Sequence, residues 1–159
     1  MSLALKLADL ADSGKPVRVG LIGAGKFGSM FLSQAPRTPG LHVLGIADRD
    51  VGRARRATER IGWPAERTDV KSFAQALKTG STFLTDDAEA LIGADGVDVI
   101  VEATGDPAAG ARHALACFRH KRHVVMVNVE ADALVGPLLA RRAADAASSI
   151  PSPMGTNRR

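Results

Sequence analysis

The sequence predicts an α/β fold, with a doubly wound parallel sheet between two layers of helices (α/β/α) in a single domain. From Val17 onward, short apolar runs alternate with amphipathic helical stretches, which is the rhythm of strand–helix–strand units. The apolar runs are rich in Val, Ile and Leu without polar alternation, so we expect strands covered on both faces. Only 4% of the 159 residues are aromatic, so the core must be aliphatic.

The elements follow in order along the chain. Residues 1–15 predict a leading helix, over 3–12, and a turn at the sequence SGKP. The domain proper, residues 16–147, begins with predicted strands at 17–23 and 42–48 and helices at about 26–35 and 50–61. A helix at about 71–79, a weak strand at 81–85 and a short helix at 86–93 come next.

The second half of the domain has two strong predicted strands, VDVIVEATG at 97–105 and HVVMVNVEA at 123–131. A helix of about 107–120 separates them, and a final helix over 131–147 follows. Residues 148–159 are dominated by Ser, Pro and Gly and show no periodicity, so we predict a disordered tail.

Composition excludes several classes of protein. The net charge is +4, but the basic residues are mixed with 17 acids along the chain, so no nucleic-acid partner is expected. Cys117 is the only cysteine, which excludes an intrachain disulfide and favours a reducing cytoplasm. No signal peptide and no membrane span are expected. Three histidines, at 113, 120 and 123, lack further ligands and predict surface or strand-start positions rather than a metal site.

Three glycines in the stretch GLIGAGKFG, residues 20–28, predict a dinucleotide site. The motif follows an apolar strand and opens a helix, as such a site requires. We expect Gly23 to allow the tight turn, Gly25 to let the backbone approach a diphosphate, and Gly28 to let helix and strand pack closely. The free amides at the helix start would then face the phosphates. The alternative is a bare strand-to-helix turn.

An acidic residue closes the second strand, twenty residues after the last glycine. Asp48 is placed to accept hydrogen bonds from the adenosine ribose, which favours NAD. Arg49 beside it, with Arg53 and Arg56 on the next turn, can instead hold a 2′-phosphate and admit NADP. The competing interpretation is that the arginines of this helix form its solvated face. The sequence therefore leaves both cofactors open.

Further polar residues follow the later strands. The carboxyl ends of parallel strands meet at one edge of the sheet, so Thr104, Gly105 and Asn128 are expected on the ribose and nicotinamide side of a cofactor. For Thr104 and Gly105 the alternative is a strand end capped by a turn. Glu102 is either part of this cluster or a buried acid satisfied by backbone amides. No residue is convincing as a general acid, and the catalytic residues stay unknown.

The segments VRVGLIGAGKFGSMFLSQ, IADRD, VDVIVEATGDP and HVVMVNVEADALVGPLLARRA together resemble the cofactor (Rossmann) domain of the homoserine-dehydrogenase-like NAD(P)-dependent oxidoreductases. They are most similar to the branch that includes the 1-deoxyxylulose-5-phosphate reductoisomerase-like protein. The resemblance covers roughly residues 16–147. It implies phosphate contacts at Gly23, Gly25, Lys26, Phe27 and Gly28. It also implies adenosine ribose contacts at Asp48 and Arg49, and nicotinamide-side contacts at Thr104, Gly105 and Asn128.

Two departures from the family qualify what the resemblance implies. Homoserine dehydrogenases share an Ala-Asn-Lys triplet at the last strand, whereas Val129 follows Asn128 here, which argues against homoserine as the substrate. The family's chains also continue into a substrate-binding and oligomerisation domain, so we expect a truncated relative that keeps the cofactor half.

The expected function is an NADP- or NAD-binding domain of an oxidoreductase that moves hydride between the cofactor and a small carbonyl or alcohol compound. An isolated chain is not expected to be fully competent, and a homo-oligomer is possible. The alternatives are a non-catalytic dinucleotide-binding module and an inactive gene fragment.

Overall fold

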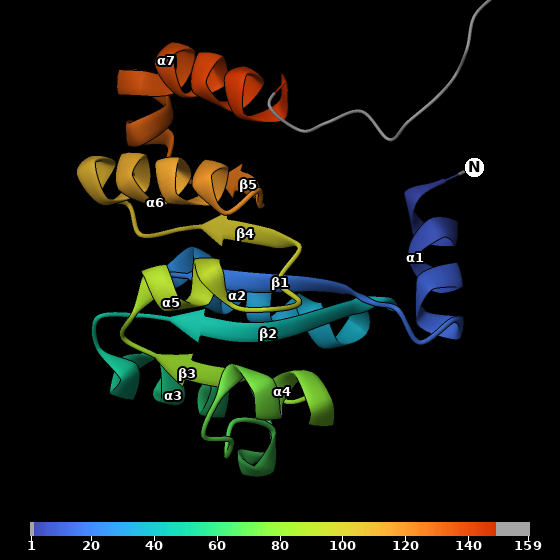
Figure 1. Cartoon of the computed structure of the whole chain (residues 1–159). Coiled ribbons are helices and arrows are strands. Elements are labelled where there is room, and N and C mark those ends of the chain that lie inside the picture. Colours follow the sequence, from blue (N-terminus) through green and yellow to red (C-terminus); the bar gives the residue numbers. More distant parts are fainter. Residues whose placement is uncertain (1, 149–159) are drawn as a thin grey trace, which may run out of the picture.

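The fold is built on one five-stranded parallel sheet, shown in Figure 1. The computed structural model describes residues 2–148. The strands lie in the order β3-β2-β1-β4-β5, and every neighbouring pair is parallel. They are β1 (Val17–Ile22), β2 (Leu41–Ala47), β3 (Phe83–Thr85), β4 (Val99–Glu102) and β5 (His123–Met126). The predicted fold class is confirmed.

The direction of winding reverses beside β1. The chain runs outward from β1 to β2 and β3, and then returns across the sheet to β4 and β5. Connections on the two sides of this reversal leave from opposite faces, and ligands of such sheets bind where the carboxyl ends of the strands at the reversal meet, here β1 and β4. The glycine loop follows β1 at this place.

Helices cover both faces of the sheet. On one face α2 (Lys26–Gln34) and α3 (Val51–Arg60) pack through Leu32 and Ala54 on a cluster that includes Leu21. On the other face, α4 (Phe73–Thr79), α5 (Ala88–Gly93) and α6 (Pro107–Arg119) pack on a second cluster, which includes Ile100. Two short 3-10 helices, Ala35–Arg37 and Ala65–Arg67, complete the connections. These two clusters, which are mostly aliphatic, are the core.

The last strand is shorter and more exposed than the sequence predicts. The predicted strand 123–131 ends at Met126, and α7 (Val129–Ser148) begins only three residues later. The Oδ1 atom of Asn128 accepts a hydrogen bond from the amide of Ala131 at 3.1 Å, so Asn128 caps this helix. β5 is an edge strand, and Val125 on it is 51% exposed. The expectation of cover on both faces is therefore wrong for β5.

Two helices lie outside the covered sheet. In Figure 1, α7 is stacked on the outer side of α6, and α1 (Leu3–Asp12) stands beyond the amino ends of the strands. The glycine loop lies at the carboxyl ends of the strands, so α1 is remote from it (Figure 1). No helix within residues 2–148 has the length and apolarity that a membrane crossing requires. The tail predicted at 148–159 lies outside the described residues, apart from the backbone of Ser148.

Candidate functional site

Two of the three loop glycines are required by their neighbours. Gly23 has a φ of +99°, and a β-carbon there would lie 2.6 Å from the carbonyl oxygen of Ala103. A β-carbon on Gly28 would collide with the carbonyl oxygen of Gly23. The turn out of β1 and the packing of α2 on it therefore depend on glycine at both positions.

Gly25 has different surroundings. It is the N-cap of α2, and a β-carbon built on it meets nothing within 4 Å. Its φ of −76° suits any residue, so neither strain nor crowding demands glycine here. Because Gly25 has no side chain to cap the helix, the first amides of α2, at Lys26 and Phe27, have no acceptor from that source. The amides beside Gly25 are therefore not blocked by a side chain at that position.

Asp48, which follows β2, is held in a network of its own. Its side chain is fully buried, and its Oδ2 accepts a hydrogen bond from the amide of Ala24 at 2.8 Å. Its Oδ1 accepts one from the amide of Asp50 at 2.9 Å. The Arg53 guanidinium donates from Nε to Oδ2 at 3.1 Å and from Nη2 to Oδ1 at 2.8 Å. The carboxylate thus ties the glycine loop to the start of α3.

The arginines of α3 lie on its solvent side, as one interpretation of the sequence has it, but two of them make ion pairs there. Arg53 is 53% exposed in its side chain while it pairs with Asp48. Arg56 pairs with the exposed Asp50 at 3.2 Å. Arg49 is exposed and adjoins the same network. The sequence reasoning missed the pairing of Arg53 with Asp48, although the spacing of five residues across a helix start was a signal for it.

A hollow of about 190 Å³ lies at the carboxyl edge of the sheet, over the ends of β1 and β2 and beside α6. Its lining combines acids and arginines from the segments that follow β2, β3 and β4: Asp48, Arg49, Arg53, Asp86, Asp106 and Arg112. Thr104 and His113 complete its polar wall. Asp106 caps α6 by accepting a hydrogen bond from the amide of Ala109 at 3.0 Å. That bond, and the nearby charges of Arg112 and Arg49, hold the pKa of Asp106 below its ordinary value.

Glu102, at the end of β4, is buried among side chains. Its Oε1 accepts a hydrogen bond from the Thr104 hydroxyl at 2.5 Å and lies 3.2 Å from Nδ1 of His113. Its Oε2 has no hydrogen-bond partner among the described residues. Burial acts to raise the pKa of Glu102, but hydrogen bonds led by that of His113 outweigh it, and the net shift is downward. The burial expected of Glu102 is present, but its partners are not backbone amides.

His113 was expected at the surface, which is wrong. Its side chain is 14% exposed, contacts Glu102 and lines the hollow. Position 113 lies on the turn of α6 that faces the end of β4, and this contact between distant residues has no local sequence signal.

Asn128 is almost fully buried, at 1% exposed. Its Nδ2 donates a hydrogen bond to the carbonyl of Asp106 at 2.7 Å, and its Oδ1 caps α7. Thr104 and Gly105 are exposed on the same edge of the sheet. The structure therefore brings the predicted residues to one edge, with the side chain of Asn128 committed to internal hydrogen bonds.

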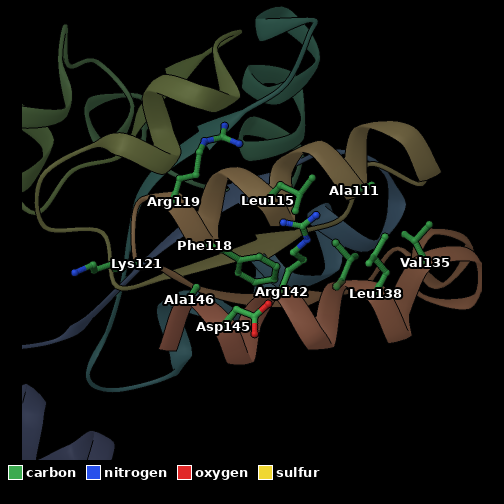
Figure 2. Close-up of a pocket in the computed structure, with 11 residues that line it drawn as sticks. Ala111, Leu115, Phe118, Arg119, Lys121, Val135, Leu138, Arg142, Asp145 and Ala146 are labelled. Atoms are coloured by element: carbon green, nitrogen blue, oxygen red, sulfur yellow. The ribbon is translucent and has the colours of Figure 1, made fainter. Parts of the chain in front are cut away.

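A larger hollow, of about 650 Å³, lies elsewhere, in a groove between α6 and α7. Figure 2 shows Leu115 and Phe118 of α6 facing Leu138 and Arg142 of α7 across it. None of the predicted site residues lines this groove.

Comparison with known proteins gives a family and a fold. The family described as "Homoserine dehydrogenase, NAD binding domain" matches residues 19–149. No curated protein sequence matches the chain.

Solved structures share the fold at low sequence identity. A homoserine dehydrogenase from Thiobacillus denitrificans is 20% identical, with a TM-score of 0.64 over 84% of this chain and 28% of its own. A 3-ketoreductase from Actinomadura kijaniata, in complex with NADP, is 23% identical, with a TM-score of 0.60 over 82% and 35%. A biliverdin reductase from Synechocystis, with biliverdin and NADP+, is 19% identical, with a TM-score of 0.61 over 83% and 36%. The chain thus spans about a third of their length.

Proposed function

Because the chain belongs to the family of homoserine dehydrogenase NAD-binding domains, we propose that it binds a nicotinamide dinucleotide across the carboxyl edge of its sheet, with the diphosphate at Gly25. The diphosphate would accept hydrogen bonds from the amides of Lys26 and Phe27 and gain from the dipole of α2. The adenosine end would lie toward Asp48 and Arg49.

The observation that carries this proposal is the contrast among the glycines. Gly23 and Gly28 are walled in by backbone, so packing alone accounts for them. Gly25 faces open space without strain, so packing does not account for it. An approaching diphosphate does, because a β-carbon at this point would hold the ligand away from the amides.

The nicotinamide end would lie toward Thr104, Gly105 and the loop that Asn128 braces. When bound, the cofactor supplies hydride exchange with a carbonyl or alcohol group. The Glu102–His113 pair lies beside this region, and Glu102 can fix the orientation of the imidazole. We propose a small carbonyl or alcohol compound as the substrate of the complete enzyme, and a reducing cytoplasm as its location, since the thiol of Cys117 is free and buried.

The test is calorimetric titration of the purified chain with NADH and NADPH, comparing the wild type with Gly25→Val. We expect the valine to weaken dinucleotide binding by about tenfold or more, since it obstructs at least one phosphate hydrogen bond to the amides. The thermal midpoint should change little, because the position is open and its φ is permitted.

Gly80→Asn is the matched control. Gly80 also faces open space, its φ of +73° tolerates asparagine, and it lies at the end of α4. It should leave dinucleotide affinity unchanged. Unchanged affinity in a folded Gly25→Val protein, or no binding of either dinucleotide to the wild type, would overturn the proposal.

A further inference from the structure

We infer that the site selects NADP over NAD, because Arg53 occupies and neutralises the acid that would otherwise recognise a free ribose, and with Arg49 offers the cations for a 2′-phosphate. This inference rests on the proposed dinucleotide site and concerns its adenosine end. An acid at the position of Asp48 by itself favours NAD, so the choice of cofactor depends on the contacts that Asp48 makes.

The carboxylate of Asp48 has little capacity left for a ribose. Such a group offers about four lone-pair positions. The amides of Ala24 and Asp50 and two nitrogens of the Arg53 guanidinium already donate to it, at distances between 2.8 and 3.1 Å. Its side chain has no exposed surface. Ribose hydroxyls would have to displace Arg53 and exchange its charge-assisted hydrogen bonds to a buried carboxylate for neutral ones, which opposes NAD recognition of the usual kind.

The net charge around Asp48 also differs from that around an unpaired carboxylate at the same position. A bare carboxylate after β2 repels a 2′-phosphate, whereas Asp48 forms a forked pair with a guanidinium. The pair uses Nε and Nη2 of Arg53, which leaves Nη1 for another acceptor. Because the Arg53 side chain is 53% exposed, a ligand can reach it. Hydrogen bonding and charge from Asp48 raise the pKa of Arg53, so the cation persists.

Arg49 supplies a second cation at the same place. It is exposed, immediately follows Asp48, and lines the same hollow of about 190 Å³ as Arg53. Arg112, Asp86 and Asp106 also line this hollow, and Asp106 is engaged as the cap of α6. Arg56, one turn further along α3, pairs with Asp50 and does not line this hollow. Arg49 and Arg53 are thus placed for a phosphate on the ribose, and Arg56 serves as a control.

The test measures the affinities of NADPH and NADH by calorimetry, and those of adenosine 2′,5′-bisphosphate and 5′-AMP as probes of the adenosine end alone. We expect wild-type protein to bind each 2′-phosphorylated ligand about tenfold or more tightly than its counterpart. Arg53→Ala should weaken NADPH by a similar factor and leave NADH equal or tighter, because the Asp48 carboxylate is released. Arg56→Ala should change neither.

Arg53→Ala removes a partner from a buried acid, so its folding is checked by circular dichroism and thermal unfolding. Arg49→Ala, at an exposed position, provides a second variant that should weaken NADPH alone. Equal affinity for both dinucleotides in the wild type, or equal losses for both in Arg53→Ala and Arg49→Ala, would overturn the inference while the dinucleotide site stands. Failure to bind either dinucleotide would overturn the proposed function as well.

Discussion

Glu102 is a buried carboxylate whose charged form depends on two side chains, the Thr104 hydroxyl and the His113 imidazole. Burial opposes ionisation, yet the net shift of its pKa is downward, so the hydrogen bonds outweigh burial. A carboxyl whose folded pKa is depressed contributes stability that is fully present above its unfolded pKa, about 4.3, and that is lost as the pH falls through the folded value.

We expect the free energy of unfolding of the wild type to fall more steeply below about pH 4.3 than that of Glu102→Gln, which has no carboxyl to protonate here. Urea denaturation between pH 7 and pH 3 measures both slopes. Glu89→Gln is the control, since that carboxylate is 57% exposed in its pair with Arg119. Parallel curves for wild type and Glu102→Gln would contradict the assignment of a depressed pKa.

At the residue scale, the sequence predicts where polar groups gather but not how they pair. The sequence places Asp48 at the end of β2, because the position of a strand end depends only on local periodicity. The partner of Asp48 is a helix residue on the next turn, and the partner of Glu102 comes from α6. Such pairs are set by rotamers and by helix rotation about the sheet, which a single sequence does not display. Asp48, which the sequence suggests as the ribose acceptor, is therefore also the acid of an ion pair with Arg53.

At the scale of elements, the junction between β5 and α7 departs most from expectation. The sequence VVMVNVEA continues apolar and suits a long strand, so periodicity extends it. Asn128 ends it instead, because its side chain bonds to Asp106 of a neighbouring loop while it caps the following helix. Prediction from periodicity uses only local sequence, so it finds long apolar runs such as β1 and β2 and misses a junction that is set by a distant contact. A tertiary hydrogen bond outweighed local propensity.

We expect Asn128→Ala to lower the free energy of unfolding by about 1–3 kcal/mol, because α7 loses its cap and the carbonyl of Asp106 loses one of its two donors. Urea denaturation at pH 7 measures the loss. Ser72→Ala is the matched control, since Ser72 caps α4 by accepting from the amide of Gln75 at 3.1 Å at an exposed site where water can replace it. The interpretation fails if Asn128→Ala costs no more than this control.

At the scale of the whole molecule, one group of exposed apolar side chains lies on β5 and α7. Val125 on β5 and Val129, Leu134 and Leu138 on α7 are between 51% and 76% exposed. Both elements lie at the β5 edge of the sheet, where β5 pairs only with β4. Within residues 2–148, the opposite edge at β3 has no comparable cluster of exposed large apolar residues. Apolar surface and an open strand edge on one side favour association of the chain with itself.

We expect the apparent molar mass of the purified chain, measured by light scattering, to rise with concentration, and that of the double variant Leu134→Lys, Leu138→Glu to rise less. The two leucines are 76% and 52% exposed, so charging them should cost the fold little. Leu3→Lys, Leu5→Glu is the matched control, since these leucines are 72% and 59% exposed on α1, remote from the β5 edge. If both double variants reduce scattering equally, general apolar exposure rather than the β5 and α7 side drives association. A wild-type apparent molar mass that stays at the monomer value at every concentration would contradict the expectation altogether.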